Sequence, residues 1–298
     1  MAIMERDRRS RQKQNTVPID RLSDLPDSIL THILSFLPTK FSVRTSILGQ
    51  RWRFPWAYVS NLIFRDDSQK SINRVLLLRK MQKVNTFCLS DDDDRYRYIN
   101  KENGAQCKKY QIDTDTWITL AVERNVQILH LCYSSWRDED FLLGLPGCLF
   151  TCKTLVHLKL ESCGIIPVRV AVCFPRLEKL HLLYVQYEAD ESLPNLLSGC
   201  PVLEDMEPRE ETKGWKEPPQ QVPACLLSHL RIIKLPNIGG EKHEFEIIKY
   251  LLRNANVLER MEISYPGSLS SNEENNMLKK ISLFQRGSKA CKVAFGAA

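Results

Sequence analysis

The sequence lacks the long apolar stretch that a membrane-spanning helix needs, since no run of about 18 apolar residues occurs in it. Its first residues, MAIMERDRRSRQKQ, also lack the apolar segment of a secretory signal. We therefore expect no membrane partner and a location in the nucleus, the cytoplasm or both. Apolar residues make up 43% of the chain and charged residues 26%, which is typical of a folded globular protein.

The sequence also lacks the compact motifs that mark common catalytic and nucleotide-binding sites. It contains no G-x-S-x-G nucleophile elbow, no G-x-x-x-x-G-K-[ST] phosphate loop and no G-x-G-x-x-G fingerprint. We therefore predict a protein that is not an enzyme and has no catalytic residues and no cofactor.

Ten cysteines are present, but their spacing does not form a metal site. Cys148 and Cys152 are the only close pair, and no second Cys or His pair completes a zinc set. The cysteines are therefore predicted to be thiols, with no metal bound. Cys163, Cys173 and Cys200 fall among apolar residues and are expected to be small buried hydrophobes.

The formal net charge of +6 is modest, and part of it lies in the first 19 residues. We predict that residues 1–19 form a disordered, solvated tail, with a nuclear-import or nucleic-acid segment as the alternative. No aromatic residues interleave with a broad basic stripe, so we expect no nucleic-acid partner.

A short amphipathic helix is predicted in the segment LPDSILTHILSFL, which runs from Leu25 to Leu37. Pro26 suits a first helical turn, and Pro38 ends the pattern. Two adjacent apolar stripes result, one formed by Leu25, Ile29, Ile33 and Phe36 and the other by Leu30, Leu34 and Leu37. This arc is wider than a core-facing helix needs, so we expect one stripe to pack inside and the other to await a partner. The alternative is a helix buried fully within its own domain.

The whole stretch 20–67 resembles the F-box of the plant F-box/leucine-rich-repeat proteins. The start LPDSILTHILSFLPTK and the pair Arg51–Trp52 carry the resemblance. It implies binding to a Skp-family adaptor, and through that adaptor to a cullin. By position, the implied adaptor contacts or their immediate supports are Leu25, Pro26, Ile29, Ile33, Val43 and Trp52.

The chain departs from this family at Gly49 and Gln50, where a Ser-Lys pair is usual. A glycine inside a helix costs about 1 kcal/mol relative to alanine. Loss of the lysine also removes a possible polar contact. We therefore expect adaptor binding to be weaker than in the family, but not absent.

A second pattern, apolar-x-x-apolar-x-apolar, recurs along the rest of the chain. From Val126 onward its copies start 29, 22, 26, 27 and 28 residues apart, which agrees with a leucine-rich-repeat period. The last two apolar positions of each copy face inward from one short strand, so neighbouring copies must stack to cover them. The copy at Leu203 and Met206 is weak because it meets Pro208. The alternative is an ordinary α/β domain with unrelated amphipathic strands.

Two further groups of segments resemble the same plant family. LFTCKTLVHLKL and ESLPNLLSGCPVLEDM resemble its repeats, and KYLLRNANVLERMEI and FQRGSKACKVAF resemble its terminal FBD module. The predicted fold is α/β, with an N-terminal helical F-box followed by a short, curved leucine-rich-repeat solenoid with parallel strands. The expected units are a tail at 1–19, the F-box at 20–67, repeats at 68–221 and an FBD-like module at 222–298.

The predicted repeat body is shorter than the family pattern, because repeats usual in the family are missing between Pro208 and Val222. Strand alternation places five residues on the concave face: His130, His157, Lys159, Lys179 and His181. They form a candidate substrate-binding surface of mildly basic character, which favours an acidic or phosphorylated target segment. The plainer interpretation is that they are solvated strand residues.

Together these features predict a substrate-recruiting, non-catalytic subunit of an SCF-type E3 ubiquitin ligase. Its F-box would hold the adaptor, and its repeats would hold a target protein that the sequence does not identify. One rival is an adaptor-independent repeat module for protein interaction, or a shortened family member with impaired substrate binding. Another is a small-molecule receptor, which would need a polar-lined concave pocket.

Overall fold

The computed structural model describes residues 22–91, 104–133, 144–210, 221–267 and 271–297. The basic tail expected at 1–19 and most of the shortened junction after Pro208 lie outside these residues. Among the helices described, none is long and apolar enough to cross a bilayer. Nor do three or more His, Cys, Asp or Glu side chains gather as metal ligands within these ranges.

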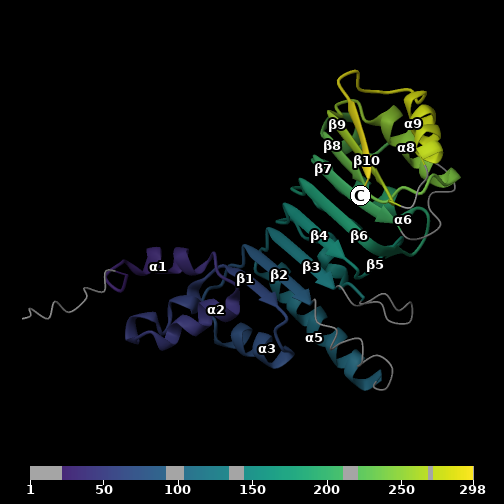
Figure 1. Cartoon of the computed structure of the whole chain (residues 1–298). Helices are drawn as coiled ribbons and strands as arrows, with labels where there is room; N and C mark the ends of the chain where they lie inside the picture. The colour runs from purple at the N-terminus through teal and green to yellow at the C-terminus, as the bar shows by residue number, and fades with distance from the viewer. Residues whose placement is uncertain (1–21, 92–103, 134–143, 211–220, 268–270, 298) are drawn as a thin grey trace, which may run out of the picture.

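The N-terminal part is a small helical module (Figure 1). It contains α1 (Asp27–Leu34) and α2 (Thr39–Arg44), followed by 3-10 turns at Thr45–Ile47, Gln50–Trp52 and Pro55–Tyr58. Pro26 and Pro38 each occupy the position just before a helix, where a missing N–H costs nothing. The module has its own small core, made of Leu30, Leu34, Trp52 and Val59.

The rest of the chain forms one continuous parallel sheet that curves from the helical module to the C-terminus (Figure 1). Its strands follow one another in chain order: β1 (Asn61–Arg65), β2 (Thr86–Asp91), β3 (Ile128–Tyr133), β4 (His157–Glu161), β6 (Lys179–Tyr187), β7 (Asp205–Glu210), β8 (Ile232–Leu235), β9 (Arg260–Tyr265) and β10 (Lys292–Ala297). The short β5 (Ile165–Ile166) pairs with the far end of β6. The predicted α/β fold with a curved, parallel-stranded solenoid is confirmed.

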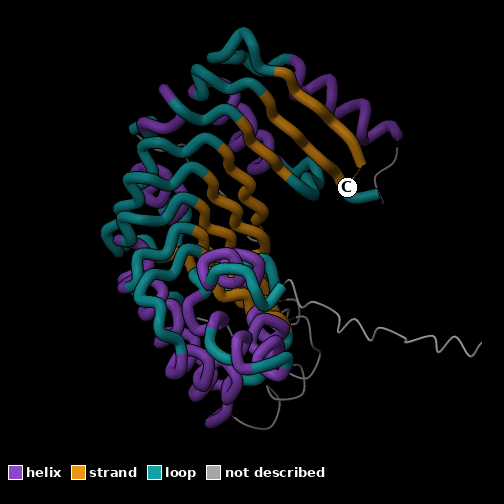
Figure 2. The backbone as a smooth tube through the Cα atoms, turned by 90° about the vertical axis from the view of Figure 1, so that its left-hand side faces the viewer, coloured by secondary structure: helices purple, strands orange, loops and turns teal. Residues whose placement is uncertain are grey.

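Helices and loops line the outside of the arc, and the strands line its inside (Figure 2). The helices after the N-terminal module are α3 (Gln69–Leu78), α5 (Gly104–Glu123), α6 (Ser192–Ser198), α7 (Ala224–Ser228), α8 (Lys242–Asn254) and α9 (Ser271–Ser282), with a 3-10 turn at Gly147–Thr151. One continuous hydrophobic core lies between the two layers. The inner side of the strands is therefore the concave face.

The repeat pattern explains why the strands stack. The first apolar residue of each copy from Val126 to Leu258 is fully buried just before its strand. A backbone carbonyl then joins each repeat to the next: Gln127 O accepts from the N–H groups of Val156 and His157, and Val156 O accepts from those of Glu178 and Lys179. The same forked bond recurs at Glu204 O and Arg231 O. Each copy thus forms backbone hydrogen bonds with the neighbouring copy and also covers the apolar face of that neighbour.

The sheet differs from the sequence prediction at both β1 and β7. Leu62 and Phe64 of β1 are buried in the main core, so the first strand of the sheet lies inside the stretch assigned to the F-box. At the other point, Pro208 does not interrupt the weak copy, because it is buried within β7. Proline lacks an N–H for the ladder, and β7 pairs with β8 only at Asp205 and Met206, before the proline.

Two of the three cysteines expected to be buried are buried. Nine of the ten cysteines, all except Cys107, are described as free thiols. Cys163 and Cys200 are buried, and their Sγ atoms lie near backbone carbonyls, with Cys163 Sγ 3.5 Å from Leu131 O. Cys173 is exposed, because the neighbouring Phe174 occupies the core position instead.

The helical module is joined to the sheet by specific hydrogen bonds. Thr39 Oγ1 accepts from Ile63 N at 2.8 Å, and Asn61 Nδ2 donates to Ser35 O at 3.2 Å. The guanidinium of Arg79, just after α3, donates to Val59 O at 3.0 Å. Burial, and then the nearby Arg124 charge, lower the pKa of Arg79 to about 10. These bonds fix the orientation of the module relative to the repeats.

Candidate functional site

Helix α1 divides its apolar residues between an inner and an outer side. Leu30 and Leu34 are at most 1% exposed in the small core. On the other side, Ile29 is 44% exposed and Ile33 38% exposed, and Phe36, just beyond the helix, is 71% exposed. The module therefore presents an apolar stripe that its own core does not cover.

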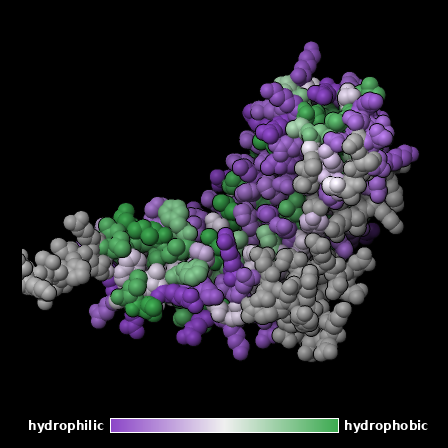
Figure 3. Space-filling view, viewed as in Figure 1, coloured by the Kyte–Doolittle hydropathy of each residue, from purple (hydrophilic) through white to green (hydrophobic). Residues whose placement is uncertain are grey.

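Other exposed apolar side chains of the module extend this stripe. We use the name "apolar module surface" for the exposed side chains Leu22, Ile29, Ile33, Phe36, Phe41, Ile47 and Leu48. Figure 3 shows apolar residues gathered over the helical module on the face in view. Exposed apolar clusters of this kind mark binding surfaces in folded proteins.

The six candidate adaptor-binding residues occupy different environments. Pro26, Ile29 and Ile33 are exposed, and Leu25 and Val43 are half-buried. Trp52 is 7% exposed, so it supports the module from inside. Phe36 belongs to the same predicted stripe and is exposed, but it was not among the six predicted contacts. Ile47 and Leu48 are also exposed, which the sequence pattern did not reveal.

The Arg51–Trp52 pair holds the segment that leads into α1. Trp52 Nε1 donates to Ser23 Oγ at 3.0 Å, and Arg51 Nη2 donates to Leu25 O at 2.7 Å. Arg51 Nη2 also lies 3.1 Å from Asp27 Oδ1, although this ion pair is too exposed to add much stability. The pair thus positions the exposed stripe without forming part of it.

Gly49 is not in a helix interior, which corrects the expected helix penalty. Helix α2 ends at Arg44, and Gly49 has an extended backbone with φ of 162° just before the turn Gln50–Trp52. A Cβ added there would meet no atom within 4 Å.

We expect Gly49→Ala to change the free energy of unfolding by less than about 0.5 kcal/mol, as for a surface site without special contacts. Urea denaturation of both proteins is the measurement. The matched control is Gly199→Ala, whose Cβ would lie 2.7 Å from Val172 O and should clearly destabilise the fold. A stabilisation of about 1 kcal/mol by Gly49→Ala would contradict this placement and favour a helical site.

The five candidate substrate-binding residues lie together on the concave face. His130 faces His157 with ring centroids 4.9 Å apart, and His157 faces His181 at 5.3 Å, both edge to face. Lys159 is in register with His130 and His181, and Lys179 is in register with His157. Strands β3, β4 and β6 thus bring the five side chains together on one face, as strand alternation predicted.

This face is of mixed charge, because carboxylates lie beside Lys159 and His181 and burial lowers the pKa values of its histidines. Lys159 Nζ pairs with Glu161 Oε2 at 2.8 Å. His181 lies 3.9 Å from an oxygen of Asp205 and 3.8 Å from one of Glu207. Neither carboxylate was predicted from the sequence, although strand alternation continued from Leu203 through Pro208 places both on this face.

His130, His157 and His181, whose rings pack one after another across the three strands, are called the histidine row; burial disfavours their charged forms. Burial first, and then the charges of His130 and His181, lower the pKa of His157 to about 4. Burial also lowers the pKa values of His130 and His181, although Glu207 and Asp205 oppose the shift at His181. The Nε2 atoms of all three rings are buried, with no hydrogen-bond partner in the described part of the chain.

We expect the free energy of unfolding to fall as the pH is lowered from about 6.5 towards 4. An unfolded histidine titrates near pH 6.5, so in this window the unfolded chain binds protons that the folded row does not accept. The contribution is complete above pH 6.5 and is lost on acidification. Urea denaturation at several pH values should show a shallower pH dependence for His157→Gln. An unchanged slope would contradict the depressed pKa of His157. The control is His229→Gln, at a half-buried histidine outside the row.

Comparison with known proteins finds matches for the helical module and for the repeats. Three family models match the chain: "F-box domain" at residues 22–54, "FBD-associated F-box protein At5g56370, LRR repeats" at 114–216 and "FBD" at 217–263. Together with the fold, these matches show an F-box-like helical module followed by a leucine-rich-repeat body and an FBD-like segment. The resemblance to the plant F-box/FBD/leucine-rich-repeat proteins is therefore confirmed.

Similar proteins come from Arabidopsis thaliana. F-box/FBD/LRR-repeat protein At5g56420 is 38% identical over 195 residues, which cover 63% of this chain and 43% of that protein. FBD-associated F-box protein At4g10400 is 35% identical over 63% of this chain and 44% of its own length. F-box protein At4g09920 is 34% identical over 63% of this chain and 58% of its own length. The chain thus spans about half the length of these curated relatives.

Proposed function

We propose that this chain is the substrate-recruiting, non-catalytic subunit of an SCF-type E3 ubiquitin ligase. The observation that carries the proposal is that α1 has a buried and an exposed apolar side. Leu30 and Leu34 fill the small core, while Ile29 and Ile33 remain exposed beside other apolar side chains. A Skp-family adaptor would cover the apolar module surface and link the chain to a cullin. The matched F-box segment, 22–54, includes all of this surface.

The repeats would hold the target protein, and the chain would act by positioning it. The bonds from Thr39, Asn61 and Arg79 connect the adaptor end to the sheet without a loose linker. A bound target would therefore be kept near the ubiquitin-charged enzyme at high effective concentration, with no catalytic side chain, cofactor or metal supplied by this chain. The location would be the nucleus, the cytoplasm or both.

The concave face is the proposed target surface, with His130, His157, Lys159, Lys179 and His181 as contacts. Its histidines with lowered pKa values and its Lys159–Glu161 ion pair do not favour an acidic or phosphorylated segment over others. Asp205 and Glu207, which belong to β7, place negative charge beside His181 at one end of the histidine row. Target recognition would then depend on the arrangement of charges and hydrogen bonds rather than on net charge.

Affinity capture from plant cells with the proteasome blocked tests this function. The intact chain should retain a Skp-family adaptor and a cullin, and a chain without residues 22–54 should retain neither. Proteins captured by both chains are target candidates, and their lifetimes should lengthen when the intact chain is removed. If the adaptor is not captured by the folded intact chain, or if no captured protein changes its lifetime, the proposal fails and an adaptor-independent interaction module is favoured.

A further inference from the structure

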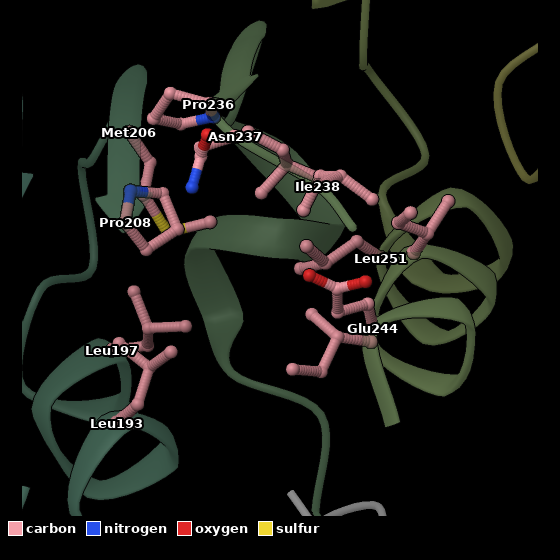
Figure 4. A pocket seen from close by; sticks show the side chains of 12 residues that line it. Leu193, Leu197, Met206, Pro208, Pro236, Asn237, Ile238, Glu244 and Leu251 are labelled. Atoms are coloured by element: carbon pink, nitrogen blue, oxygen red, sulfur yellow. The ribbon is translucent and has the colours of Figure 1, made fainter. Parts of the chain in front are cut away.

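An apolar pocket lies between helices α6 and α8 and the ends of strands β7 and β8 (Figure 4). Its volume is about 50 Å³. Leu193 and Leu197 of α6 form one wall, and Leu251 of α8 lies on the opposite wall. The pocket is on the core side of the sheet, away from the concave histidine row, so the proposed ubiquitin function does not require it.

The pocket exists because the sheet opens at this point. Strands β7 and β8 pair at only two positions, ending at Met206 and Ile233, whereas β8 continues to pair with β9 as far as Leu235. Beyond Met206 the wall is formed by Pro208, and beyond Leu235 by Pro236. Neither proline has an N–H group, so neither contributes a backbone donor that would need water.

Two polar side chains interrupt this apolar lining, and they differ in their hydrogen bonding. Glu244 is fixed, since its Oε1 accepts from Gly239 N at 3.0 Å and its Oε2 from Glu241 N at 2.7 Å. The side-chain amide of Asn237 points into the pocket and makes no hydrogen bond to the residues that the structure describes (Figure 4). Asn237 holds this position with a left-handed backbone, φ 62°.

We propose that this pocket binds a small, neutral, largely apolar molecule that carries one hydrogen-bonding oxygen. The aliphatic walls bury the apolar body of the ligand, and the Asn237 amide donates to its oxygen. The fixed, half-buried carboxylate of Glu244 repels an anionic ligand at close range. The volume admits a ligand of about four non-hydrogen atoms, since one water-sized atom takes about 10–15 Å³.

Titration of the full chain with acetone, followed by saturation-transfer NMR, tests the site. Acetate is the matched anionic probe, because it keeps the size and shape of acetone and adds the charge. We expect the ketone to bind and the carboxylate not to bind. Absence of ketone binding, or equal binding of the two probes, would overturn the proposal.

Two variants then test the polar groups separately. Asn237→Gly suits the left-handed backbone and removes only the amide, so the ketone should bind about fivefold more weakly, as expected for one lost hydrogen bond. Glu244→Gln removes the charge at nearly constant size, so the carboxylate should now bind. Circular dichroism checks that each variant is folded. Unchanged ketone affinity in folded Asn237→Gly, or continued exclusion of the carboxylate by folded Glu244→Gln, would contradict the assigned roles.

Discussion

Replacement of Ile33 by aspartate is expected to abolish binding of a Skp-family adaptor while leaving the chain folded. Ile33 is 38% exposed on the outer side of α1, and the small core is built from Leu30 and Leu34 on the other side. A carboxylate placed in the apolar module surface would lose its water when a partner covers it. Burial of such a charge without a partner costs at least about 3 kcal/mol, or roughly a hundredfold in affinity.

Isothermal titration with a purified Skp-family adaptor measures this effect. The matched control is Leu227→Asp, because Leu227 is 45% exposed on α7, far along the solenoid from the module. That variant introduces the same charge at similar exposure and should bind the adaptor normally. Retained affinity in folded Ile33→Asp, or an equal loss in Leu227→Asp, would show that the apolar module surface is not the adaptor site.

Replacement of Trp117 by alanine is expected to lower the free energy of unfolding by about 3–5 kcal/mol, as for other large aromatic residues removed from a core. Trp117 lies on α5 and is 1% exposed. Its Nε1 donates to Asn73 Oδ1 of α3 at 2.6 Å, and its ring meets that of Tyr110 edge to face. The substitution removes the contact between α3 and α5 and leaves a cavity behind the first strands.

Urea denaturation measures the loss, and Trp117→Phe separates its two causes. Phenylalanine keeps most of the buried ring but removes the N–H, and the partner Asn73 is exposed enough to turn to water. Trp117→Phe should therefore cost clearly less than Trp117→Ala. Equal losses would assign the effect to the hydrogen bond, and a loss below about 1 kcal/mol for alanine would show that α5 is not part of the cooperative core.

The repeat architecture could be predicted from the sequence because its signal is local and periodic. Residues such as Leu155, Leu158 and Leu160 are spaced so that one strand buries them, and the same spacing returns in each copy. The resemblance of the segments 149–160 and 191–206 to the plant family agreed with that period. The domain limits at 20–67, 68–221 and 222–298 stay predictions, since the matched segments do not fix where each unit ends.

The character of the concave face could be predicted only in part. Alternation correctly placed His130, His157 and His181 on one face, but their charge state depends on burial and on neighbours from other strands. Edge-to-face packing of the three rings and the carboxylates of Asp205 and Glu207 turned an expected basic surface into a mixed one. Such effects arise between residues far apart in the chain, so no local pattern reports them.

By itself, the sequence determined the two stripes of α1, the repeat period and the strands that follow from it, because these depend on the spacing of apolar residues within a few turns. Only the tertiary structure decided which stripe of α1 is covered, that Gly49 lies outside a helix, and that Leu62 and Phe64 begin the sheet. It also decided that β7 and β8 separate after Met206 and leave a pocket. Each of these outcomes depends on which surfaces meet in space, and burial between distant segments is settled only when the whole chain packs.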